Sequence, residues 1–120
     1  MRTEERRRSE RVNVAIPIDV TGNGDTACGQ TVNISMNGIY FQSNLYMDPL
    51  TKVRMGLVIP VENGSESVEK KAMFDGVVVR TEPEAETENE NVTNYRIAVY
   101  ITYMSKDSMN ILSEFINRHI

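Results

Sequence analysis

The sequence contains one cysteine and one histidine, and it has no long run of apolar residues. The lone Cys28 excludes an internal disulfide and fits a reducing compartment, where we expect a small buried thiol. His119 lies far from Cys28 along the chain, which gives little support for a metal site or a Cys/His nucleophile. A membrane-spanning helix needs about twenty apolar residues, and no apolar segment follows the basic N-terminus as a secretory signal requires. These absences predict a cytoplasmic protein with no membrane span, no metal and no enzymatic activity.

Negative side chains outnumber positive ones, but the two signs are unevenly distributed. The 120 residues carry 17 acidic and 13 basic side chains, for a net charge of −4. Residues 1–11 hold five arginines and three glutamates, which leaves this segment at +2 and the remainder at −6. Duplex binding favours an extended basic face, whereas a small anionic ligand needs one local positive cluster. The distribution argues against nucleic acid as the partner.

The length and the apolar pattern predict one mainly β domain. A chain of 120 residues suits a single core. Apolar and polar residues alternate with a period of two in several segments separated by Gly/Asn turns, which is typical of half-buried strands. We expect strands at 12–20, about 28–35, 39–42, 52–60, 68–80 and 94–104. This pattern predicts a small six-stranded antiparallel β-barrel over residues 12–120, with residues 1–11 as a flexible arginine-rich arm.

Several positions predict breaks in these strands. Pro17 has no backbone donor, so its strand is expected at an edge or with an irregularity there. The pair Asn37-Gly38 predicts a tight turn with positive φ. The long fifth strand is expected to bend near Asp75-Gly76. Residues 81–93 are rich in glutamate and lack an apolar pattern, so we interpret them as a solvated loop.

A helix is predicted over about residues 105–119, at the end of the chain. Ser105 suits the N-cap position, and Asp107 lies in the first turn, where the helix dipole favours negative charge. Apolar residues then recur at helical spacing, at Met109, Leu112, Phe115 and Ile116. This apolar stripe is expected to cap an open end of the barrel.

Two polar segments are candidates for an anion site. Arg7 and Arg11 are four residues apart, so they point to the same side in an extended chain or in a helix. Guanidinium groups bind phosphates and guanine edges through paired donors. Residues 33–38 (NISMNG) form a short polar turn whose glycine allows close backbone approach. Taken singly, an arginine cluster is often a solvated tail and such a turn is often purely structural; their occurrence together favours a site.

At these segments the sequence resembles the PilZ domain family. Residues 7–11 (RRSER) match the family's R-x-x-x-R motif, and residues 33–38 match its D/N-x-S-x-x-G motif at every fixed position. Residues 76–80 (GVVVR) and 95–99 (YRIAV) resemble later strands of the family, and the segment from Ser105 onward resembles its terminal helix. The resemblance covers essentially the whole chain and implies a bacterial receptor for cyclic di-GMP.

The resemblance also implies particular ligand-binding residues. Carried over by position, these are Arg7, Arg11, Asn33, Ser35 and Gly38, with a further contact from Arg6. Family members with arginine at the Arg6 position can favour two intercalated ligand molecules. Asn33 and Ser35 are expected to share one strand face and meet one base, with Ile34 pointing into the barrel. Ala98 and Ile101 stand where the family often has Gly and Phe, which bears on local packing and stoichiometry.

The expected mechanism is a disorder-to-order switch. Ligand phosphates would neutralise the arginines of residues 1–11, and the arm would fold over the 33–38 turn and create a surface for a downstream protein partner. The resemblance suggests motility, exopolysaccharide production or virulence as outputs. Two alternatives remain open: an adaptor of the same fold that binds no nucleotide, and a general RNA-binding barrel. The acidic body and the few exposed aromatics argue against the second.

Overall fold

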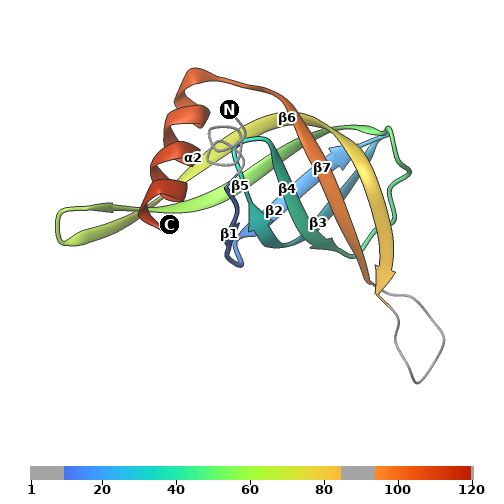
Figure 1. Cartoon of the computed structure of the whole chain (residues 1–120), viewed down its shortest axis with the longest axis horizontal. Helices are drawn as coiled ribbons and strands as arrows, with labels where there is room; N and C mark the ends of the chain where they lie inside the picture. The colour runs from blue at the N-terminus through green and yellow to red at the C-terminus, as the bar shows by residue number, and fades with distance from the viewer. Residues whose placement is uncertain (1–9, 85–93, 120) are drawn as a thin grey trace.

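The computed structural model describes residues 10–84 and 94–119, so most of the predicted arm and residues 85–93 of the predicted loop lie outside the described residues. The elements follow the order β1 (Val12–Asn13), β2 (Pro17–Gly22), β3 (Asp25–Ile34), β4 (Gly38–Ser43), β5 (Lys52–Asn63), β6 (Glu66–Glu84), β7 (Asn94–Met104) and α2 (Lys106–Arg118) (Figure 1). The strands pair antiparallel throughout. The predicted fold class, mainly β with a C-terminal helix, is confirmed.

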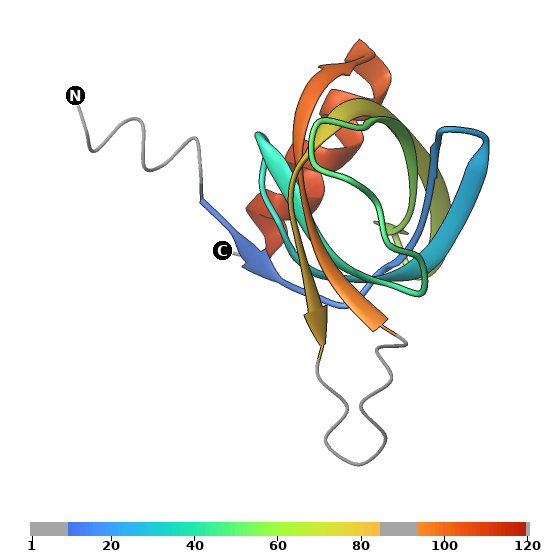
Figure 2. The same ribbon diagram turned by 90° about the vertical axis from the view of Figure 1, so that its right-hand side faces the viewer.

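Six of the strands form a closed ring. The order β3-β2-β5-β6-β7-β4 is closed by a further pairing of β3 with β4, and β1 pairs with the last residues of β3 in line with β2. Figure 2 looks into this ring. Every second side chain of a strand points into the ring and fills its interior. These buried side chains include Val53, Met55, Leu57 and Ile59 on β5, and Ile97, Val99 and Ile101 on β7. Each such side chain contributes roughly 1.5–3 kcal/mol when fully buried, so the period-two pattern accounts for the barrel.

The first predicted strand, residues 12–20, is divided into β1 and β2. Between the two strands, the Ile16 amide donates a hydrogen bond to the Thr31 side chain, at 2.9 Å from Oγ1, instead of to a backbone carbonyl. The Thr31 amide donates to the Ile16 carbonyl at 2.9 Å. The irregularity expected around Pro17 is therefore confirmed. The edge position is wrong, because β2 lies between β3 and β5. Pro17 is tolerated as the first residue of the strand, before pairing with β5 begins at Ile18.

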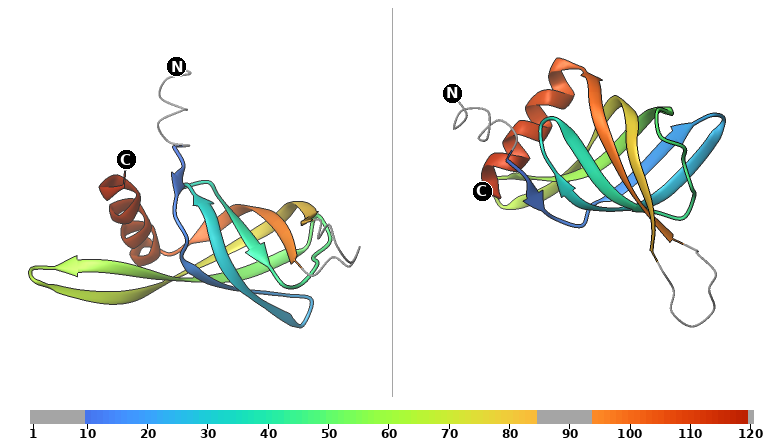
Figure 3. Two further views of the ribbon diagram at one scale, coloured as in Figure 1. Left: turned by 90° about the horizontal axis from the view of Figure 1, so that it is seen from below. Right: turned by 45° about the vertical axis from the view of Figure 1, so that its right-hand side comes forward.

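The β5–β6 hairpin is longer than predicted and extends past the ring beside α2 (Figure 3). Its pairing continues to Asn63 and Glu66, whereas β2 pairs with β5 no further than Leu57. The bend expected in β6 is confirmed as a register shift between Asp75 and Gly76. A Cβ at Gly76 would lie 2.7 Å from the Tyr100 carbonyl oxygen, so this position needs glycine for close packing of β6 on β7.

The helix α2 begins and packs nearly as predicted. The Ser105 side chain caps it by accepting a hydrogen bond from the Ser108 amide at 3.1 Å. Leu112, Phe115 and Ile116 are buried, but Met109 is 44% exposed, so its place in the apolar stripe was wrong. Ser108 faces the sheet instead, because its hydroxyl accepts a hydrogen bond from the Met73 amide at 3.0 Å.

Two further observations bear on the sequence predictions. The Cys28 thiol is exposed rather than buried, since the inward position on this part of β3 belongs to Ala27. Within residues 10–84 and 94–119, no helix has the length and apolar character needed to cross a bilayer. The division into an arm and one domain at residues 11 and 12 stays a prediction.

Replacing Leu112 with alanine should lower the free energy of unfolding by about 2–5 kcal/mol, because this side chain is fully buried between α2 and the sheet. Met109→Ala, on the exposed side of the same helix, should cost less than about 1 kcal/mol. Urea denaturation of both variants measures the difference. Equal losses would contradict the described orientation of α2.

Candidate ligand-binding site

A hollow of about 360 Å³ lies on the outer surface of the ring, where the 33–38 turn meets β6 and β7. Four strands, the residue before β1 and the turn after β3 contribute to its lining: Arg11, Asn33, Asn37, Gly38, Ile39, Tyr40, Val79, Arg80, Ala98, Val99 and Tyr100. Three of the predicted site residues, Arg11, Asn33 and Gly38, are among them. The structure therefore brings part of both sequence motifs to one concave surface.

Arg11 and Asn33 are in direct contact. The Arg11 Nη1 donates a hydrogen bond to Asn33 Oδ1 at 2.8 Å. This contact follows from the pairing of β1 with β3, which sets Val12 opposite Ile34 and Asn13 opposite Asn33. The last residue of one motif thus meets the first residue of the other across 22 positions of sequence. The predicted contacts of Arg6 and Arg7 fall outside the described residues.

Ser35 is a buried residue of the turn and does not face the hollow. Its Oγ accepts from the Gly38 amide at 3.1 Å and the Asn37 amide at 3.2 Å, and it lies 3.2 Å from the Gly38 carbonyl oxygen, to which it donates. The side chain is 0% exposed. The expectation that Asn33 and Ser35 share a face is therefore wrong, because β3 ends at Ile34 and the chain turns there. Ile34 is buried in the core, as predicted.

Gly38 is required for packing rather than for backbone conformation. The described residues with positive φ are Asn23, Gly24, Leu50 and Gly64, so the positive φ expected at the Asn37-Gly38 pair is wrong. A Cβ at Gly38 would instead lie 2.8 Å from the Val99 carbonyl oxygen on β7. The absence of a side chain lets β4 approach β7 at the edge of the hollow.

The sequence prediction missed Tyr40 and Arg80, which line the hollow on either side of Ala98. Tyr40 on β4 and Arg80 on β6 both pair with Ala98 on β7. The small Ala98 side chain thus lies at the centre of a row whose outer members are an aromatic ring and a cation. The alternation along β4 could have shown that the Tyr40 side chain points out of the barrel. Its proximity to Arg80, however, depends on how strands far apart in sequence pair with each other.

Charged side chains surround the Tyr40 ring. The guanidinium carbons of Arg80 and Arg96 lie 5.7 and 6.0 Å from its centroid, within the range of cation–π attraction. Arg96 pairs with Glu84 at 3.0 Å, and this hydrogen bond raises the pKa of Arg96. Arg80 pairs with Glu82 at 3.6 Å. The hollow therefore combines positive charge with an aromatic surface, which suits an anionic ligand with flat rings.

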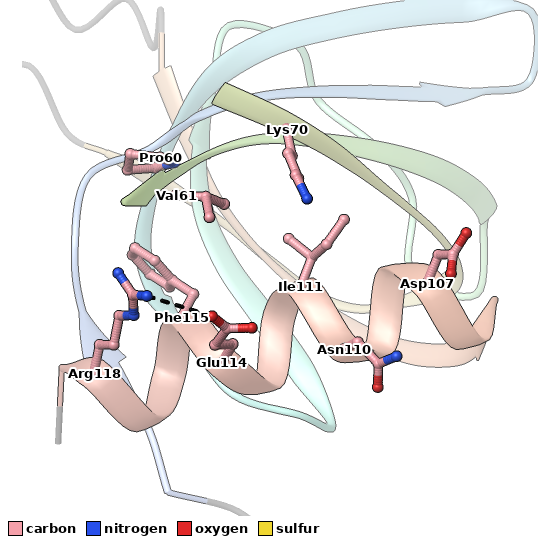
Figure 4. A pocket seen from close by; sticks show the side chains of 9 residues that line it. All are labelled: Pro60, Val61, Lys70, Asp107, Asn110, Ile111, Glu114, Phe115 and Arg118. Carbon is pink, nitrogen blue, oxygen red and sulfur yellow. Dashed lines mark hydrogen bonds and ion pairs between the residues drawn. The ribbon is translucent and has the colours of Figure 1, made fainter. Parts of the chain in front are cut away.

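A second hollow of about 470 Å³ lies between α2 and the β5–β6 hairpin (Figure 4). Ile111 and Phe115 on the helix face Val61 on the hairpin, and the rest of the lining consists of Pro60, Lys70, Asp107, Asn110, Glu114 and Arg118. It is the larger of the two, yet none of the predicted site residues lines it. Among the described residues there is also no cluster of three potential metal ligands. The chemistry at the Arg11 hollow makes that hollow the candidate site.

Replacing Ser35 with alanine should lower the free energy of unfolding by about 1–3 kcal/mol, because two amide donors of the turn lose their acceptor. Ser67→Ala, at an exposed position of the β5–β6 hairpin, should change it by less than about 0.5 kcal/mol. Chemical denaturation measures both. A neutral effect of Ser35→Ala would show that the serine does not hold the turn.

Comparison with known proteins identifies the family. Among solved structures, the inhibitor of motility MotI/DgrA of Bacillus subtilis has a TM-score of 0.70 at 17% identity, covering 94% of this chain and 51% of that one. The PilZ domain of Escherichia coli YcgR, in a structure with c-di-GMP, has a TM-score of 0.64 at 13% identity, covering 95% and 91%. At these identities the likeness shows the fold, and this chain spans about half the length of MotI/DgrA.

A search of curated protein sequences gives no match. The model of the PilZ domain, however, matches residues 5–118, almost the full length of the chain. This family consists of cyclic di-GMP receptors and adaptors rather than enzymes. The protein therefore belongs to the PilZ domain family.

Proposed function

We propose that this chain is a cyclic di-GMP receptor that binds its ligand at the Arg11 hollow and signals to a partner protein. The observation that carries the proposal is the hydrogen bond from Arg11 Nη1 to Asn33 Oδ1. It joins the two sequence motifs at the rim of one hollow that also contains Tyr40 and Arg80. The similarity to the PilZ domain of YcgR, whose structure was solved with c-di-GMP, supports the same ligand.

The chemistry of the hollow matches the ligand. Cyclic di-GMP has two phosphate charges and two guanines, and each guanine presents O6 and N7 acceptors that suit a guanidinium fork. Arg11 and Arg80 offer such forks, and the Tyr40 ring offers a surface for stacking. In this proposal Asn33 meets the ligand, whereas Ser35 and Gly38 act by shaping the turn.

The arm completes the site in this proposal. Arg6 and Arg7 bind the phosphates and guanine edges as residues 1–11 close over the 33–38 turn, and the closed arm forms the surface that a downstream protein reads. The extra arginine at position 6 favours two intercalated ligand molecules. Cys28 has no disulfide partner within the chain, which is consistent with a cytoplasmic location. An acidic body favours this small ligand over nucleic acid.

Arg7→Ala and Arg11→Ala should each weaken cyclic di-GMP binding at least about tenfold, because each removes a charge-assisted pair worth about a decade or more. Arg54→Ala removes the same charge from β5, where Arg54 pairs with Asp75 outside the hollow, and should change affinity by less than about twofold. Titration calorimetry gives affinity and stoichiometry together, with GMP and cyclic AMP as ligand controls. Unchanged affinity in both site variants would reject the assignment.

Saturating cyclic di-GMP should slow amide hydrogen exchange throughout residues 2–11, because the arm becomes hydrogen-bonded against the ligand and the turn. Exchange in the 64–71 part of the β5–β6 hairpin, remote from the hollow, should stay unchanged and serves as an internal control. If the ligand binds and residues 2–11 still exchange at their ligand-free rate, the arm does not close. A well-folded protein that binds no ligand would favour the adaptor without nucleotide binding.

A further inference from the structure

One carboxylate at the rim of the hollow contacts two of the residues that line it. The Tyr40 hydroxyl donates a hydrogen bond to Glu82 Oε1 at 3.1 Å, and Arg80 Nε lies 3.6 Å from the same oxygen. The Arg80 guanidinium is also 5.7 Å from the centre of the Tyr40 ring. A single oxygen atom of Glu82 therefore connects the aromatic ring and the cation that flank Ala98.

The strand register explains why Glu82 reaches both side chains. Tyr40, Ala98 and Arg80 form one row across β4, β7 and β6. The next row on the same face contains Gln42, Arg96 and Glu82. Since residues two apart on a strand point to the same face, Glu82 stands directly beside the row that borders the hollow.

Within the part of the chain that the structure describes, the other charged groups on this face already have partners. Glu84 binds Arg96 at 3.0 Å and accepts a hydrogen bond from Gln42 Nε2 at 2.7 Å. Arg11 bonds to the neutral Asn33 side chain. Glu82 is thus the carboxylate that contacts both Tyr40 and Arg80, two groups that the hollow would present to a ligand. A phosphate entering the hollow therefore competes with Glu82 for Arg80.

We propose that Glu82 is an affinity-determining residue, an internal competitor that holds Arg80 and Tyr40 until a phosphate-bearing ligand displaces it. This inference rests on the proposed function. If Glu82 holds Arg80 for part of the time, only the remaining molecules have Arg80 free for the ligand. The apparent affinity is then the intrinsic affinity multiplied by the fraction of molecules in which Arg80 is free. The side chains of Arg80 and Glu82 are 60% and 54% exposed, so solvent screens their pair and the effect on affinity is modest.

The test compares Glu82→Gln with Glu69→Gln by calorimetric titration of cyclic di-GMP. The amide introduced by Glu82→Gln keeps the shape of the side chain and can still accept from Tyr40, but it removes the negative charge that holds Arg80. We expect Glu82→Gln to bind about threefold to fivefold more tightly than the parent protein. Glu69→Gln makes the same charge change on the exposed β5–β6 hairpin and should alter affinity by less than about twofold.

Two further measurements separate release of Arg80 from a general charge effect. In an Arg80→Ala background, Glu82→Gln should change affinity by less than about twofold, because no cation remains to be released. At about 0.5 M NaCl the gain from Glu82→Gln should also fall below about twofold, since salt screens the exposed pair. A gain that persists in the Arg80→Ala background would overturn the inference.

The outcomes distinguish this inference from the proposed function. If the parent protein binds cyclic di-GMP and Glu82→Gln binds no more tightly than Glu69→Gln, Glu82 is not a competitor, while the receptor function stands. If the parent and all variants keep their fold by circular dichroism and none binds the ligand, both the proposed function and this inference are rejected. If Glu82→Gln binds cyclic di-GMP and the parent protein and Glu69→Gln do not, Glu82 prevents binding in the parent protein and its role as a competitor is supported.

Discussion

The candidate site depends on the pairing of β4 with β3 on one side and with β7 on the other. This double pairing closes the ring of six strands. It sets Asn33, near the end of β3, opposite Tyr40 on β4, and Tyr40 in turn opposite the small residue Ala98 on β7. Gly38 makes the closure possible, since any side chain there would collide with the Val99 carbonyl oxygen. The same glycine therefore serves the fold and the shape of the hollow.

Positive charge gathers at the hollow although the net charge of the chain is negative. The chain is acidic as a whole, yet Arg11 and Arg80 line the hollow, and Arg96 lies close to its Tyr40 wall. Glu84 balances Arg96 through a half-buried ion pair, and Glu82 balances Arg80 through an exposed one; exposed pairs contribute little to stability. Such pairs can exchange partners at small cost, so an anionic ligand can replace a carboxylate without disturbing the core. In the proposed receptor, such weak exposed pairs suit reversible ligand binding better than a buried salt bridge would.

The strands and the helix were largely predictable, because alternation and capping are local signals. Residues 94–104 and the Ser105 cap were predicted correctly from their own pattern. Errors arose where partners far along the chain decide the outcome. Thr31 breaks the first strand by bonding to Ile16, and Ser108 displaces Met109 from the buried helix face by bonding to Met73. Neither of these bonds has a signature in residue spacing.

For the candidate site, the order of residues was enough to establish the chemistry of the two motifs: guanidinium groups in the arm, and a polar turn that ends in glycine. Which of these groups meet depends on the folded sheet. It places Arg11 on Asn33, removes Ser35 from the surface, and adds Tyr40, Arg80 and Glu82 from β4 and β6. The physical reason is that side-chain types and short-range spacing can be read along the chain, whereas proximity across strands is set by the register of the closed sheet.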